Sequence, residues 1–492
     1  MKENQSSYRQ IIKATSLFGG VQVFNIIISI IKSKIIAVLL GPSGMGIAGL
    51  LTSTIGLVGT ITNFGLRTSA VKDIAAANES QDSNRVSKIA TIFRRLVWIT
   101  GVLGAIVTII FSPWLSEFAF DNRDYSIAFI WLSITLLFNQ LTSGQNVLLQ
   151  GMRKLKDLAK ANMIGSSLGL LVTTPLYYFY DIDGIVPAII LSSILSLLIA
   201  YFFANKIKIK KIKVTIQDTL QEGNEMLKMG FILSISGLIT QAAAYGVRIF
   251  VSNTGSIEDV GLYNAGFAII GTYVGLVFAA MATDYYPRLS GVADNNYKAN
   301  KLINQQAEIC VLILAPILSV FLIFINWIII ILYSTKFIPI NDMIHWAALG
   351  MYFKSVSWAI GFILFAKGAS KTFFWSELIA SFYLFLFNII GYKYFGLKGL
   401  GISFLIGYII VLFQIYYIAK YKYSFSFNTE FYKIFGIQFL LGLLSFMVIK
   451  YLPTPLAYYV GIPFIFISTY FSYKELDKRI GIKQLLTKYL KR

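Results

Sequence analysis

The 492-residue sequence contains one cysteine and one histidine, and both shortages exclude classes of protein. A single cysteine, Cys310, allows no intramolecular disulfide and no cysteine-based metal cluster. The single histidine, His345, has no group of ligands near it in sequence, so we predict no metal centre and no cofactor. The chain also lacks a glycine-rich phosphate loop followed by Lys-Ser or Lys-Thr. We therefore expect a protein that is not an enzyme.

Charge is scarce as well, at 13% of residues, whereas 56% are hydrophobic. Repeated apolar runs of about 20 residues match the thickness of a bilayer. We predict an all-α polytopic membrane protein of about 14 transmembrane helices, with the N-terminal apolar run retained as the first span. The predicted spans are 14–40, 44–66, 89–112, 126–149, 158–180, 184–204, 227–251, 260–283, 305–332, 342–366, 372–394, 399–419, 432–451 and 455–473.

The net charge of +20 reflects orientation and does not indicate a nucleic-acid partner. If the N-terminus is cytoplasmic, the inner segments hold 34 lysines and arginines and the outer loops hold five. Basic residues concentrate on the cytoplasmic side of membrane proteins. We therefore expect both termini in the cytoplasm.

An internal repeat is visible at an offset of 215 residues, where Trp131 aligns with Trp346 and Gly184 with Gly399. Six spans separate the copies, so both run in the same direction, as in transporters built from parallel repeats. We predict an N-lobe at 1–206, a cytoplasmic linker at 207–226 and a C-lobe at 227–420, around a central cavity. The two last spans and a basic tail fill 421–492.

The first hairpin, residues 16–67, is unusually polar for lipid-facing helices. Its second half carries glycines, threonines and Asn63 after a turn at Gly41-Pro42-Ser43-Gly44. Small residues let helices approach closely, and hydroxyls and amides can line a wet interior. This pattern predicts a pathway through the membrane.

We single out four of the basic residues within the spans, because charge there is costly and usually faces a cavity. They are Lys32, Lys34, Arg248 and Lys354. We expect them to face a central cavity that accepts anions, although the first three are also near enough to a span end to reach the interface. Amides in the spans could hydrogen-bond sugar hydroxyls or hold helices together, and the candidates are Asn63, Asn139 and Gln145.

Few carboxylates lie in or beside the spans, and these are the candidates for coupling transport to an ion. Glu377 lies about one turn into a span, Glu308 near the start of another, and Asp284 at the end of a third. Each could also pair with a basic loop residue.

Several stretches resemble one bacterial transporter family. Residues 36–49 (IAVLLGPSGMGIAG) resemble the first hairpin of Wzx-type flippases, in the branch of O-antigen translocases and lipid III flippases. Residues 286–290 (YPRLS) and 366–370 (AKGAS) are similar to that branch, as are the pair Lys336-Phe337 and the residues Trp346, Lys354 and Glu377. The likeness covers nearly all of the first twelve spans and lies within the multidrug/oligosaccharidyl-lipid/polysaccharide exporter superfamily.

The resemblance implies a flippase for undecaprenyl-diphosphate-linked oligosaccharides in the bacterial inner membrane. Such a protein would move O-antigen or a related repeat unit to the outer leaflet by alternating access. It would draw on a proton or sodium gradient and could have a polysaccharide polymerase as partner. A cationic cavity suits the diphosphate, and amides suit the sugars.

Three other functions stay open at this point. A multidrug or cation antiporter of the same superfamily would favour carboxylates in its cavity, whereas the deep charges here are mostly basic. A membrane glycan polymerase or ligase would need a sizeable outer catalytic loop, which the sequence lacks. A passive channel would not require the two-lobe repeat.

Overall fold

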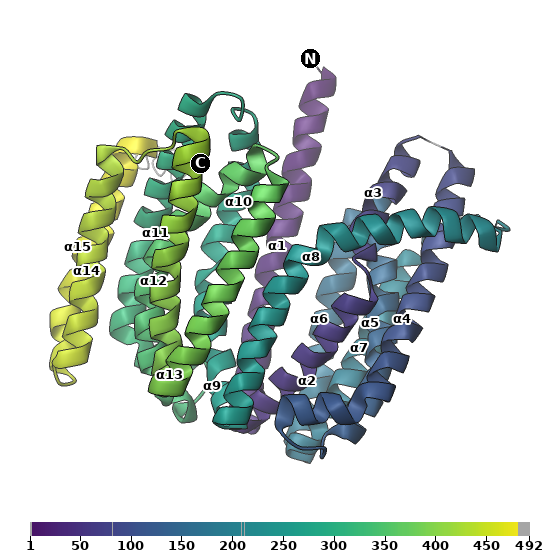
Figure 1. Cartoon of the computed structure of the whole chain (residues 1–492), viewed down its shortest axis with the longest axis horizontal. Helices are drawn as coiled ribbons and strands as arrows, with labels where there is room; N and C mark the ends of the chain where they lie inside the picture. The colour runs from purple at the N-terminus through teal and green to yellow at the C-terminus, as the bar shows by residue number, and fades with distance from the viewer. Residues whose placement is uncertain (1, 81, 208, 211, 481–492) are drawn as a thin grey trace, which may run out of the picture. The chain divides into compact units, whose positions relative to one another are not determined.

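A computed structural model describes residues 2–80, 82–207, 209–210 and 212–480. The described residues form helices joined by short turns and contain no strand (Figure 1). Within a bilayer a helix satisfies its backbone hydrogen bonds internally, so a chain this apolar has few alternatives. The all-α polytopic fold predicted from the sequence is confirmed.

The chain divides into two units at Gly261. The first unit contains eight α-helices and a short 3₁₀ helix among its described residues. They are α1 (Lys2–Leu39), α2 (Gly41–Thr62), α3 (Leu66–Glu79), α4 (Ser83–Phe120), α5 (Ser126–Gly151), α6 (Leu155–Tyr180), η1 (Asp181–Gly184), α7 (Ile185–Ala204) and α8 (Ile216–Thr254).

The second unit begins at Leu262, within α9. Its core is built around α11, on which α12, α14 and α15 pack. Its elements are α9 (Ile257–Phe267), the π-helical η2 (Ala268–Val274), α10 (Leu276–Ser290), α11 (Asn296–Leu332), the 3₁₀ helix η3 (Thr335–Ile340), α12 (Asn341–Ala366), α13 (Ser370–Tyr423), α14 (Thr429–Tyr451) and α15 (Leu456–Ile480).

The number of spans agrees with the sequence. Eleven segments of the described chain are long and apolar enough to cross a membrane, and a bent helix pair raises the number to twelve. Two of these segments, Leu155–Ala204 and Ser370–Tyr423, each cover two predicted spans. The second of them is interrupted at Gly396, which adopts φ 58°. If each is counted as two spans, the twelve become fourteen.

The break of the first hairpin lies at Leu40, directly before the predicted turn at Gly41-Pro42-Ser43-Gly44, and those four residues form the first turn of α2. Helix α1 ends at Leu39 and α2 begins at Gly41, which has a positive φ of 68°. Pro42 follows in the first turn of α2, where its missing N–H leaves no intrahelical partner unsatisfied.

Helix α8 bends by 51° between Phe231 and Ser234, and Figure 1 shows its two arms. The bend lies against the break between α2 and α3. Gly65 occupies that break with φ 63°, and a Cβ on it would collide with the backbone oxygen of Gly230. Glycine at both positions therefore allows the two chain segments to touch.

Helix α8 packs on α2, α3 and α4 within the first unit. The sequence assigned this helix, as its seventh span, to the C-lobe. The lobe boundaries inferred from the repeat stay a prediction, since a repeat describes ancestry and does not by itself determine which neighbours a helix packs against.

Candidate functional site

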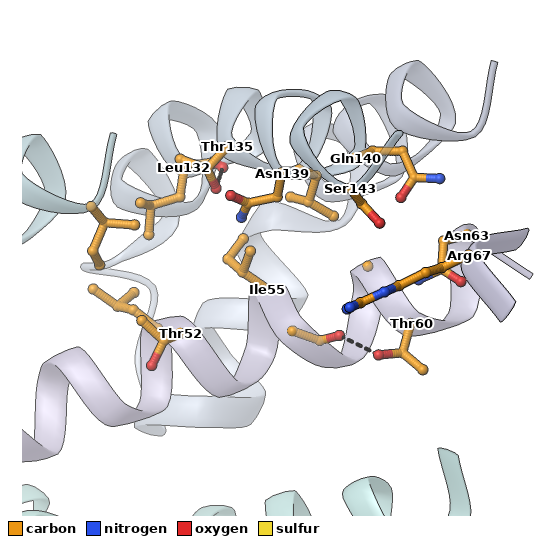
Figure 2. A pocket seen from close by; sticks show the side chains of 15 residues that line it. Thr52, Ile55, Thr60, Asn63, Arg67, Leu132, Thr135, Asn139, Gln140 and Ser143 are labelled. Carbon is orange, nitrogen blue, oxygen red and sulfur yellow. Dashed lines mark hydrogen bonds between the residues drawn. The ribbon is translucent and has the colours of Figure 1, made fainter. Parts of the chain in front are cut away.

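A cavity of about 330 Å³ lies within the first unit, between α2 and α5 (Figure 2). Polar side chains make up much of its wall, together with the glycines of α2. The cavity is lined by Leu51, Thr52, Ile55, Gly56, Gly59, Thr60, Asn63, Arg67, Leu132, Thr135, Leu136, Asn139, Gln140, Ser143 and Ile189.

Three of these side chains offer polar groups to the open space. In Figure 2, Asn139 and Ser143 point from α5 toward α2, and the guanidinium of Arg67 extends between the two helices. Among the described residues, none of these three side chains makes a hydrogen bond or an ion pair. Together they present a cation, an amide and a hydroxyl, which are groups that bind anions and sugar hydroxyls.

Other polar groups of the cavity hold its walls in place. The Asn63 side-chain oxygen accepts a 2.7 Å hydrogen bond from the backbone N–H of Gly65, which fixes the turn after α2. The Thr60 hydroxyl lies 3.0 Å from the Gln241 side-chain oxygen on α8. Gln140 donates to the Thr100 hydroxyl on α4 at 2.9 Å. These hydrogen bonds hold the cavity wall in place on several sides independently of any ligand.

Two of the predicted sugar-binding residues, Asn63 and Asn139, both line this cavity. The sequence did not lead us to predict its cation, Arg67. Sequence reasoning counted Arg67 among the cytoplasmic loop residues. The turn at Phe64 and Gly65, both with positive φ, redirects the chain so that Arg67 on α3 returns to the wall beside Asn63. The available signal was glycine following a polar helix end, which favours a tight turn.

A second cavity, of about 220 Å³, lies within the second unit between α12 and α13. Lys354 and Glu377, predicted separately as an anion ligand and an ion-coupling group, both line it. The Lys354 ammonium lies 5.1 Å from the ring centre of Tyr408 and 5.5 Å from that of Phe404. Both rings are within the range in which an aromatic face attracts a cation.

The two charged groups of this cavity are not an ion pair. Within the described part of the chain, neither the Glu377 carboxylate nor the Lys354 ammonium makes a hydrogen bond or a salt bridge, and the ammonium lies over the two aromatic rings. Nearby, Gln414 donates to the Ser376 hydroxyl at 2.9 Å and accepts from the Tyr383 hydroxyl at 2.8 Å. This network ties the two arms of α13 together and leaves both charges open to the cavity.

The predicted cations of the first unit lie outside the α2–α5 cavity. Lys32 is half-buried on α1. Lys34 lines an apolar groove of about 490 Å³ between α1 and α6, beside Tyr178 and Phe179. Arg248 is half-buried on α8 and donates to the backbone oxygen of Ala244 at 3.2 Å.

Gln145 lines neither of these two cavities. It belongs to a third cavity, of about 390 Å³, where the start of α4 and the ends of α5 and α7 meet. This places it apart from Asn63 and Asn139, with which the sequence grouped it.

Two of the predicted carboxylates have partners. Asp284 is exposed and accepts a 3.0 Å hydrogen bond from Arg288, one helical turn away. Glu308 is buried on α11, where Arg479 of α15 donates to it at 2.9 Å and Asn428 at 3.0 Å. Glu377 is the one of the three without such a partner among the described residues.

Solved structures similar to this chain include a lipid flippase and multidrug transporters. The lipid II flippase MurJ in an inward closed conformation aligns with a TM-score of 0.68 at 15% identity, covering 94% of this chain and 99% of that one. An inward-facing multidrug resistance transporter of the MATE family aligns with a TM-score of 0.69 at 16% identity, covering 82% and 94%. The chain therefore shares the fold of these two transporters.

Sequence comparison then identifies the family. A family model described as polysaccharide biosynthesis protein matches residues 35–342, which is more than half of the chain, and the chain belongs to that family. The lipid III flippases of Escherichia coli (strain K12) and Shigella flexneri are each 20% identical over 360 residues, covering 71% of this chain and 83% of theirs.

Proposed function

We propose that the protein is a flippase that carries lipid-linked oligosaccharide repeat units, of O-antigen or a related surface polysaccharide, across the bacterial inner membrane. The observation that carries this proposal is the α2–α5 cavity in a member of a polysaccharide biosynthesis family. Its free amide and hydroxyl suit sugar hydroxyls, and its free guanidinium suits a phosphate. The alignment to lipid III flippases supports the same class of substrate.

The diphosphate of an undecaprenyl-diphosphate carrier requires positive charge, because it loses hydration on leaving water. Arg67 can supply a bidentate fork to its oxygens, and Lys354 a mobile point charge. We assign both residues to diphosphate binding at different stages of the cycle. The roles expected from sequence for Lys32, Lys34 and Arg248 stay part of this proposal.

Coupling to a proton or sodium gradient is assigned to Glu377. Its carboxylate lines the same cavity as Lys354 without being neutralised by it. A cation bound at Glu377 would lower the net negative charge that a diphosphate meets beside Lys354. Glu308 and Asp284 already have basic partners, which favours structural roles for them.

The substrate is tested by deleting the gene and measuring which lipid-linked intermediate accumulates in the cytoplasmic leaflet. We expect undecaprenyl-diphosphate oligosaccharide to accumulate, and the wild-type gene to restore export. Unchanged glycan export together with increased accumulation of a cationic dye would instead identify a multidrug transporter.

The orientation, with both termini in the cytoplasm, is tested by labelling single cysteines from outside intact cells. The native Cys310 is buried and gives little background. A cysteine at Asp121 or Asp183 should react with an impermeant thiol reagent, and one at Lys154 should not. The opposite pattern would reverse the direction of transport proposed here.

A further inference from the structure

The third cavity, which sequence reasoning did not anticipate, has the composition of an anion site. Arg94 of α4, Gln145 of α5, and Tyr201 and Asn205 at the end of α7 all contribute to its wall. These side chains offer a guanidinium, two amides and a phenol, all of which donate hydrogen bonds. No carboxylate is among its lining residues.

The segment after α7 adds further positive charge next to this cavity. Residues 206–214 alternate between lysine and apolar residues, as KIKIKKIKV. Ile209, Ile212 and Val214 pack into the core beneath α4, and Ile207 and Ile209 line the cavity. The lysines described in this segment, Lys206, Lys210 and Lys213, are exposed. The isoleucines thus pack inward, and the described lysines are exposed in the segment that follows the cavity wall.

The helices beside the cavity have surfaces suited to lipid. On α4, Trp98 is 52% exposed and Ile99 59%, and on α7, Leu198 is 58% exposed and Phe202 63%. Side chains this apolar are stable at the surface of a membrane protein because they contact acyl chains. Trp98 also lines the cavity, and tryptophan is enriched where acyl chains meet headgroups.

We propose that the cavity between α4, α5 and α7 binds the phosphate headgroup of a lipid in the cytoplasmic leaflet. Arg94 and the amides of Gln145 and Asn205 would contact the phosphate, and the exposed Lys206, Lys210 and Lys213 would attract it. The orientation proposed above places this end of α7 on the cytoplasmic side, where basic pockets between transmembrane helices hold anionic lipids. The acyl or prenyl chains would lie along the exposed apolar faces of α4 and α7.

Native mass spectrometry of the purified full-length protein tests this site. The probes are phosphatidylglycerol, phosphatidylcholine and undecaprenyl diphosphate, each titrated separately and then in competition. We expect phosphatidylglycerol to be retained about fivefold more than phosphatidylcholine for each basic residue engaged. Arg94→Gln should reduce that preference, and Arg94→Lys should keep most of it. Asn205→Leu should weaken the binding of both lipids, because its amide would contact the phosphate that the two lipids share.

Arg85→Gln is the matched control, because Arg85 is an exposed arginine on the same helix that does not line the cavity. Melting temperatures of all variants check that they are folded. If undecaprenyl diphosphate displaces phosphatidylglycerol in an Arg94-dependent manner, the lipid phosphate is that of an arriving carrier. If phosphatidylglycerol alone depends on Arg94, it is that of a membrane phospholipid. Binding that responds equally to Arg85→Gln and Arg94→Gln, or to neither, would overturn the proposal.

Discussion

The α2–α5 cavity of the first unit and the α12–α13 cavity of the second differ in the chemical groups that line them. The first is rich in hydroxyls and amides and has one cation, Arg67, on its wall. The second is walled mainly by apolar and aromatic side chains and contains charges of both signs, Lys354 and Glu377. At the repeat offset of 215 residues, Lys354 of the second cavity aligns with Asn139 of the first, so the two cavities differ in charge at an equivalent position.

This difference suggests that the two cavities have different roles in transport. A polar cavity recognises a large hydrophilic group through many weak contacts, each of which contributes about 1 kcal/mol. An aromatic cavity with two opposite charges has fewer contacts but responds strongly to any change in charge, since low dielectric strengthens electrostatic interactions. Recognition is therefore expected to depend on the first cavity, and energy coupling on the second.

The largest effect is expected at Arg67. Arg67→Ala should lower the affinity for the lipid-linked substrate roughly ten- to hundredfold, because a hydrogen bond to a charged group contributes about 1.5–3 kcal/mol. The measurement is export of glycan together with binding of undecaprenyl diphosphate to the purified protein. Lys72→Ala, at an exposed lysine on the same helix, is the control and should have no effect. Equal behaviour of the two variants would remove the first cavity from diphosphate binding.

A somewhat smaller effect is expected at Lys354. Lys354→Ala should reduce export about tenfold, Lys354→Arg should be tolerated better, and Lys354→Glu should be worst, because the sign of the charge decides attraction or repulsion. Each variant is assayed for export at matched protein abundance. Lys371→Ala, at an exposed lysine at the start of α13, serves as control. Wild-type export by Lys354→Ala would leave the second cavity without a role in binding the anion.

Substitutions at Glu377 and Glu308 distinguish a role in ion coupling from a role in the stability of the fold. Glu377→Gln should abolish the stimulation of transport by an ion gradient, measured in proteoliposomes, with little change in melting temperature. Glu308→Gln should leave that stimulation intact but lower the free energy of unfolding by about 1.5–3 kcal/mol, since it weakens the buried bond to Arg479. Gradient-driven transport retained by Glu377→Gln would reduce Glu377 to a packing residue.

The smallest effect is expected at Asp284. Asp284→Asn breaks only an exposed contact to Arg288 on the same helix, and such pairs contribute about 0.3–0.5 kcal/mol. Export and melting temperature should both stay at the wild-type level. A clear loss of gradient dependence here would move the coupling site from Glu377 to α10.

The sequence by itself determined the class of fold, the first hairpin and the predicted positions of the spans. In an apolar run long enough to cross a bilayer, a helix satisfies all backbone hydrogen bonds internally. Local composition is therefore enough to predict the helix. The positive φ of Gly41 and its proline neighbour lie at the predicted turn for the same local reason. Residues on one helix segment, such as Asn139 and Ser143, could be placed on a common face from their spacing.

Only the tertiary structure decided which residues share a cavity. Arg67 lines the same cavity as Asn63 and Asn139 because the turn at Phe64 and Gly65, both with positive φ, redirects the chain. Gln145 lines a different cavity. Lys354 and Glu377 line one cavity because α12 and α13 pack together. The charge of Glu308 is instead neutralised by Arg479, which lies 171 positions later in the chain. Whether a charge stays free depends on partners distant in sequence, and helix packing, which local composition does not encode, brings those partners together.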